Sequence, residues 1–173
     1  HIINRYMYPN DWIELRVDLM SKDLANRLIH SSIPSTTIIT CRSVRQGGQG
    51  TSDTIDWFHK EYKDSGHYID VEYDCVGYDV EPQRMVLSAH TVGMNETVNA
   101  IEKMKCRDAY RYKIVIDFEL DVVQNLQSLI ERYPQLLTQQ WMIWISGESY
   151  QDFRYIKSLT DWVYLSYSDR VSA

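Results

Sequence analysis

Charged side chains stand within three segments that otherwise have the composition of β-strands, residues 11–18, 36–42 and 111–117. In the first segment Glu14 and its charged neighbours alternate with aliphatic residues, so the charges share one face of an extended strand. Lys113 stands among apolar residues in the third segment. If these segments are neighbours in one buried sheet, their carboxylate, guanidinium and amine groups converge on a single polar site.

A fourth segment, residues 67–73, repeats the alternation, with Asp70 and Glu72 on one face and apolar residues on the other. The repetition argues against a chance arrangement of charges. We expect Asp70 and Glu72 to join an inner polar network without a chemical role of their own. His90 closes the next strand-like segment, residues 84–90, and its position at a strand end favours a role in the site.

The composition fits one domain with a substantial core, because 44% of the 173 residues are hydrophobic and 12% are aromatic. The net charge of −6 and the absence of clustered basic residues argue against direct contact with nucleic acid. No apolar run reaches the length of a membrane span. Cys41, Cys75 and Cys106 lack the spacing of a disulfide framework or a zinc site, so we expect no metal and an intracellular location, cytoplasmic or nuclear.

Strands and helices are predicted to alternate along most of the chain. Apolar residues at helical spacing follow several of the strands, with helix starts near Ser21 and near Ser52 or Asp53. The connection after residue 73 is too short for a comfortable helix, and residues 1–10, which lack a clear period, are expected to be a loop or an arm. The predicted strands are residues 11–18, 36–42, 67–73, 84–90, 111–117, 141–146 and 162–166.

Alternating strands and helices imply an α/β fold with a parallel sheet, either doubly wound or closed as a barrel. Charged residues within the strands favour the barrel, because doubly wound strands are apolar on both faces. The predicted fold is therefore an incomplete (β/α)8 TIM-type barrel of about seven strands, forming a single domain over residues 1–173. Trp141, Trp144 and Trp162 are expected to pack between the strands and the outer helices.

Five short motifs, in this order and spacing, resemble the strand motifs of the type I 3-dehydroquinate dehydratases. The resemblance covers nearly the whole chain, and it rests on the order of the motifs because each is weak by itself. The motifs are Glu-Leu-Arg-Val-Asp at 14–18, Thr-Cys-Arg at 40–42 followed by Gln-Gly-Gly at 46–48, Tyr-Ile-Asp-Val-Glu at 68–72, Leu-Ser-Ala-His at 87–90 and Tyr-Lys-Ile-Val at 112–115.

The resemblance implies elimination of water from 3-dehydroquinate through an imine between a lysine and the ketone, without a cofactor. A protonated imine withdraws electrons from the adjacent carbon and makes its proton removable. On this basis Lys113 is expected to form the imine, His90 to act as the general acid and base, and Gln46 to hydrogen-bond the histidine in the catalytic group.

The resemblance also implies a set of ligand-binding residues. Glu14, Arg16 and Arg42 match the residues for substrate hydroxyls and the polar network, and Arg154 matches the arginine that pairs with the substrate carboxylate. Glu14 and Arg16 could instead form a purely structural pair within the barrel. The implied ligand is a carboxylated cyclic polyol, quinate or 3-dehydroquinate.

Several departures from the family pattern leave two functions open. Gln46 replaces the glutamate of bacterial members, as in fungal ones, and Thr91-Val92 replaces the usual Asp-Phe. A first strand, a loop over the substrate and a last helix also lack counterparts, which suggests a fragment of a larger protein or one that contacts other domains, a second copy or an activator protein. The chain is then either a degenerate metabolite-sensing domain, like that of the fungal quinate-pathway repressor, or an active dehydratase. A different imine-forming barrel such as an aldolase would explain Lys113 but not the 46–48 loop.

Overall fold

One open sheet forms the centre of the computed structural model, which describes residues 3–6, 12–145 and 164–166. Strands β2 to β7 all run parallel, β1 pairs antiparallel with β2, and β8 pairs antiparallel with β1. The order across the sheet is β7-β6-β5-β4-β3-β2-β1-β8. The strands are β1 (Ile3–Tyr6), β2 (Trp12–Arg16), β3 (Thr37–Thr40), β4 (Tyr68–Glu72), β5 (Met85–Val92), β6 (Arg111–Asp117), β7 (Trp141–Ile145) and β8 (Tyr164–Ser166).

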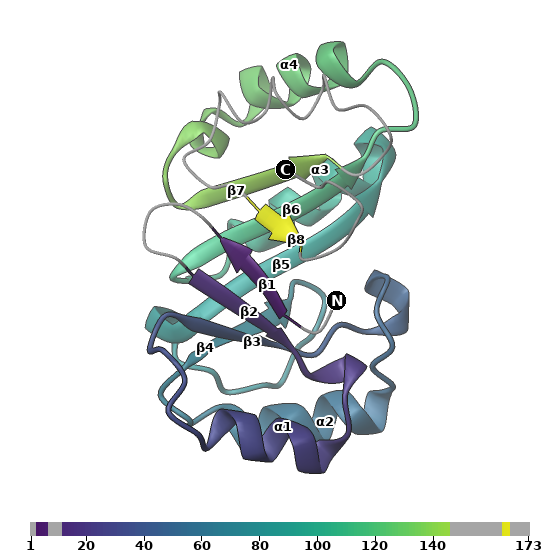
Figure 1. Ribbon diagram of the computed structural model, residues 1–173. Helices are drawn as coiled ribbons and strands as arrows, with labels where there is room; N and C mark the ends of the chain where they lie inside the picture. Colours follow the sequence, from purple (N-terminus) through teal and green to yellow (C-terminus); the bar gives the residue numbers. More distant parts are fainter. Residues whose placement is uncertain (1–2, 7–11, 146–163, 167–173) are drawn as a thin grey trace.

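In the part of the chain that the structure describes, four α-helices cover the outside of the sheet. In Figure 1 α1 and α2 lie together beside β2, β3 and β4, and α4 lies beyond β7. Side-chain caps fix two of the helix starts, because Ser21 accepts a hydrogen bond from Leu24 N and Thr51 accepts one from Thr54 N. The helices are α1 (Lys22–Ile29), α2 (Ser52–Tyr62), α3 (Gly93–Met104) and α4 (Val122–Arg132), with 3-10 turns η1 (Val17–Leu19), η2 (Val44–Gln46), η3 (Pro82–Arg84) and η4 (Pro134–Leu137).

The six parallel strands curl into a half-barrel, which is the α/β fold of an incomplete TIM barrel. In the parallel part of the sheet, each strand lies next to the strand that follows it in the sequence, as the alternation of strands and helices predicts. The connection from β4 to β5 contains only η3, which confirms the expectation that no α-helix fits there.

The alternation of side chains gives the sheet two distinct faces. Residues such as Leu15, Ile69 and Ile114 point toward the helices and form the main core with Phe58 and Tyr62. The inner face carries a second, small apolar cluster at the start of the strands, and polar and charged residues above it. The members of the small cluster are Trp12, Ile38, Val86 and Met142.

The two ends of the sheet differ from the prediction. Residues 1–10 were expected to form a loop or an arm, but residues 3–6 form β1, which pairs antiparallel with β2. Strand β8 lies within the predicted strand 162–166, yet it pairs with β1 and so lies at the opposite end of the sheet from β7. The period-2 signal is too short in these segments to assign a partner or a direction. The first predicted strand also ends earlier, because residues 17–19 turn into η1.

Candidate ligand-binding site

Lys113 and Glu14 meet across the inside of the half-barrel, although they come from β6 and β2. The Lys113 Nζ atom lies 3.1 Å from Glu14 Oε1, and the two residues are only 5% and 1% exposed. The Thr40 hydroxyl on β3 donates to the same carboxylate oxygen over 2.8 Å. A buried amine is therefore held in one place by a carboxylate that is itself oriented by a neighbouring strand.

His90 lies on β5, the strand next to Lys113, and faces the same interior. Burial and the neighbouring cations Arg42, Lys113 and Arg16 push the pKa of this imidazole well below its usual value of 6.5. Its Nδ1 atom is buried and has no hydrogen-bond partner among the described residues. The ring is therefore neutral at pH 7, and no described side chain forms a hydrogen bond with its Nδ1 atom.

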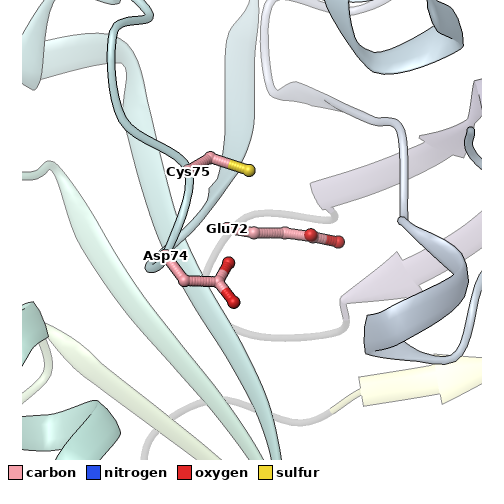
Figure 2. A group of neighbouring side chains, drawn as sticks. All are labelled: Glu72, Asp74 and Cys75. Carbon is pink, nitrogen blue, oxygen red and sulfur yellow. The ribbon is translucent and has the colours of Figure 1, made fainter. Parts of the chain in front are cut away.

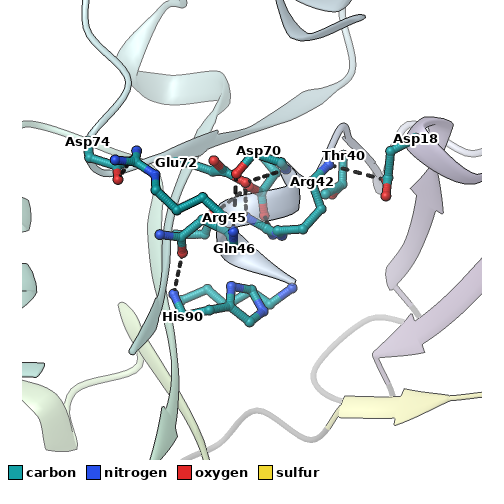
Figure 3. Close-up of polar contacts among 12 residues, drawn as sticks. Asp18, Thr40, Arg42, Arg45, Gln46, Asp70, Glu72, Asp74 and His90 are labelled. Carbon is teal, nitrogen blue, oxygen red and sulfur yellow. Dashed lines mark hydrogen bonds and ion pairs between the residues drawn. The ribbon is translucent and has the colours of Figure 1, made fainter. Parts of the chain in front are cut away.

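Gln46 touches the main chain of His90 and not its ring. The Gln46 Oε1 atom accepts a hydrogen bond from His90 N over 2.6 Å, as Figure 3 shows. This contact departs from the expectation that the glutamine would hydrogen-bond the imidazole. It ties the loop after β3 to the end of β5, so the present geometry gives Gln46 a positioning role.

Arg42 is the centre of a buried polar network at the ends of β3, β4 and β5 (Figure 3). Its guanidinium donates to Asp70 over 2.8 Å, to Ser88 over 2.8 Å and to Glu72 over 3.4 Å. Although burial alone would favour the neutral form, the carboxylates of Asp70, Glu72 and Glu14 raise the pKa of Arg42 above its ordinary value. The expectation that Asp70 and Glu72 belong to an inner network is thus confirmed.

The loop of residues 43–50 packs directly on Arg42. Gly47 has a φ of 83°, and a Cβ atom at Gly48 would lie 2.2 Å from the Arg42 carbonyl oxygen. Ser43 caps η2 by accepting a hydrogen bond from Gln46 N. The two glycines therefore allow the turn that delivers Gln46 to His90.

Arg16 reaches the interior from the end of β2 but is already paired. Its guanidinium makes a bidentate contact with Asp18, with distances of 2.8 and 2.7 Å. Burial of Asp18 opposes its ionisation, but Arg16 and the backbone N–H groups of Arg42 and Gln49 lower the pKa of this carboxyl overall. Arg16 is thus paired with Asp18, whereas the alternative hypothesis paired it with Glu14.

A cavity of about 200 Å³ opens between these strands. Its polar wall holds five of the predicted site residues, and its apolar wall is formed by β6 and β7. Trp144 lines this cavity from β7, so the expectation that it packs toward the outer helices is wrong. Arg154, expected at the ligand carboxylate, lies outside the described residues. The lining residues are Glu14, Arg16, Arg42, His90, Lys113, Val115, Met142 and Trp144.

Thr40 and Ser88 are functional neighbours that the sequence interpretation missed. Both are fully buried, and each connects a charged residue of the site to a second strand. Thr40 stands two residues before Arg42, and Ser88 stands two residues before His90, so each shares a face with a site residue. This spacing was the available signal. A hydroxyl among apolar neighbours was too common a feature to be singled out.

The half-barrel fold, with a buried lysine and a histidine facing one polar cavity, defines a TIM-barrel-type site at the carboxyl ends of the strands. The profile of the type I 3-dehydroquinase family matches residues 2–117, which is more than half of the chain. The chain therefore belongs to the type I 3-dehydroquinase family. A comparison with curated proteins gives no match. Within the described residues no helix is long and apolar enough to cross a membrane.

Proposed function

We propose that this domain binds a carboxylated cyclic polyol, quinate or 3-dehydroquinate, in the cavity beside Lys113 and His90, and that it does so as a degenerate metabolite-sensing domain of a quinate-pathway repressor. Membership of the family supports a 3-dehydroquinate-like ligand. The cavity is lined by two guanidinium groups and an amine, which suit a carboxylate and hydroxyl groups.

The state of His90 supports a sensor more than an efficient enzyme. A general base works best when its pKa is near the working pH and when another group orients it. The pKa of His90 is pushed well below 6.5, and its Nδ1 atom has no partner within the described part of the chain. The ring is therefore a weaker base than an ordinary imidazole, and no described residue orients it through Nδ1, whereas ligand binding requires neither property.

An active 3-dehydroquinate dehydratase is the second candidate, and one observation favours it. Lys113 and His90 line the same cavity from adjacent strands, where an imine and a proton-transfer group would be needed together. Glu14 accepts a hydrogen bond from the amine and would keep it in place for attack on a ketone.

Borohydride trapping separates the two candidates. The protein is incubated with 3-dehydroquinate and borohydride, and its mass is measured by mass spectrometry. A covalent adduct that Lys113→Ala abolishes would establish imine chemistry. Lys60→Ala is the matched control, because Lys60 is exposed on α2. The sensor hypothesis expects no adduct and no formation of 3-dehydroshikimate.

Ligand binding is tested independently by thermal unfolding with quinate or 3-dehydroquinate. A ligand that binds only the folded state must raise the melting temperature. We expect a rise with at least one of the two compounds and a smaller rise in Lys113→Ala than in Lys60→Ala. If neither compound changes the melting temperature at millimolar concentration, the proposed ligand class is wrong.

A further inference from the structure

Three potential metal ligands gather where β4 ends, next to the Arg42 network. Glu72 is the last residue of β4, and Asp74 and Cys75 follow in the turn. One ligand atom from each of the three residues lies within 4.8 Å of the others. Figure 2 shows the two carboxylates and the thiol around a common space.

Each carboxylate of this cluster has one oxygen in use and one without a partner. Glu72 Oε1 accepts hydrogen bonds from Ser43 N and Arg42, and Asp74 Oδ2 pairs with Arg45. Glu72 Oε2 and Asp74 Oδ1 are buried and have no hydrogen-bond partner among the described residues. Glu72 is only 3% exposed, so this oxygen has lost water without gaining a donor.

A cavity of about 500 Å³ opens beside the cluster, between the turn after β4 and the start of α2. Glu72 and Cys75 both line it, as do Thr51 and Ser52 at the helix start. The cavity gives an ion and its water a way in from solvent. It also leaves space for a fourth ligand, which three protein ligands on Zn2+ require.

We propose that Glu72, Asp74 and Cys75 form a binding site for a divalent transition-metal ion, of which Zn2+ is the best match. A thiolate is a soft ligand that Mg2+ and Ca2+ do not prefer, whereas Zn2+ binds sulfur and carboxylate oxygen together. Zinc bonds of about 2.0–2.3 Å require the three ligand atoms to lie well within 4.8 Å of one another. Cys75 and Asp74 lie in a turn and are partly exposed, so their side chains can adjust to this spacing.

Two arginines beside the cluster contact its carboxylates from one side only. Arg42 and Arg45 each occupy one carboxylate oxygen and leave the other for an ion. An ion that binds here displaces the proton of the Cys75 thiol, because the thiolate is the form that coordinates metal. The sequence did not predict this site, because it combines a single cysteine with carboxylates and has no recurrent ligand spacing.

Metal titration of the full chain tests the proposal. Protein without a histidine tag is freed of metal with a chelator and titrated with Zn2+ in competition with a chromogenic chelator. We expect one equivalent to bind, and Cys75→Ser and Asp74→Asn each to weaken binding by about tenfold or more. Cys106→Ser is the matched control, because Cys106 is exposed just after α3 and is not one of the three ligands, so it should leave the affinity unchanged.

Cobalt spectroscopy identifies the sulfur ligand without relying on the stability of a variant. Co2+ bound to the unmodified chain should show a thiolate-to-cobalt charge-transfer absorption that Cys75→Ser removes and Cys106→Ser retains. Circular dichroism and the melting temperature establish that the variants are folded. Equal Zn2+ affinity in Cys75→Ser and in the unmodified chain, a Co2+ spectrum without sulfur coordination, or no stoichiometric binding at all would each overturn the proposal.

Discussion

The Arg42 network and the Lys113 cavity occupy the same inner face of the half-barrel, yet their polar groups are satisfied in different ways. Arg42 borders the cavity but donates to three side chains from β4 and β5, which hold its guanidinium in place. Lys113 and His90 border a cavity of about 200 Å³. Alternating charges on a strand can therefore indicate a polar contact between strands or a ligand-binding site. Which of the two applies depends on whether each charge faces polar side chains or a cavity.

This difference predicts that Arg42 matters chiefly for stability and Lys113 chiefly for binding. A buried charge that loses its partner is costly because neither water nor another group replaces that partner. A charge that borders a cavity can be reached by water when its partner is removed. Substitutions in the two regions should thus separate stability from ligand affinity.

The largest effect is expected for Arg42→Met, which leaves the buried carboxylates of Asp70 and Glu72 without their cation. Breaking a buried pair from one side costs about 3–5 kcal/mol in the free energy of unfolding. Urea unfolding measures this loss. Arg27→Met is the control, because its ion pair with Asp23 on α1 is exposed and should contribute less than about 0.5 kcal/mol. Equal losses in the two variants would contradict the role of the network.

Acid should lower the free energy of unfolding through His59, which is buried on α2. Burial is the main cause that lowers the pKa of His59, to about 4, while Asp70 and Asp56 act weakly in the opposite direction. The ring is neutral in both states at pH 7. Below pH 6.5 the unfolded chain binds a proton that the folded chain does not bind until about pH 4, so the free energy of unfolding falls as the pH falls through this range.

The expected loss from His59 is roughly 3 kcal/mol between pH 6.5 and pH 4. Urea unfolding at several pH values should give a flatter profile for His59→Asn than for the unmodified protein. His30→Asn, at an exposed position after α1, is the control and should retain the slope. An unchanged slope in His59→Asn would show that the ring is not buried in its neutral form.

Lys113→Met should lower stability by only about 1–2 kcal/mol, because Thr40 still donates to Glu14 and the cavity admits water. Affinity for quinate or 3-dehydroquinate should fall by about tenfold or more, since a cation is lost from the cavity wall. Calorimetric titration beside urea unfolding gives both quantities. The comparison fails if Lys113→Met is as unstable as Arg42→Met while it binds ligand normally.

The smallest effect is expected for Gln46→Glu, which places a carboxylate beside the main chain of His90. A negative charge favours the imidazolium form, so the pKa of His90 should rise toward its ordinary value. Proton NMR of the imidazole follows this titration. Gln49→Glu in the same loop is the control, because Gln49 is exposed and should leave the pKa unchanged. No rise in Gln46→Glu would place the carboxylate too far from the ring to act.

The sequence predicted the parallel part of the fold and most of the cavity because both follow from local periodicity. The alternation around Glu14 and around Asp70 identified the inner face, and the cap at Ser21 identified the start of α1. The pairing of β1 could not be predicted in this way, because a strand of four residues carries too little pattern to specify a partner. The same limit applies to Trp144, since the wall of a cavity and an ordinary core need equally apolar side chains.

Strand β1 has a consequence for the order in which the sheet opens and closes. It places Asn4 beside Ser166, so this pairing joins residues from nearly opposite ends of the chain. Closing so long a loop costs conformational entropy. The pairing of β5 with β6 joins segments that are close in the sequence and avoids most of this cost, although it contains more residue pairs. The amide hydrogens of β8 should therefore exchange with solvent well before those of β5 and β6, and β8 should join the sheet last during refolding.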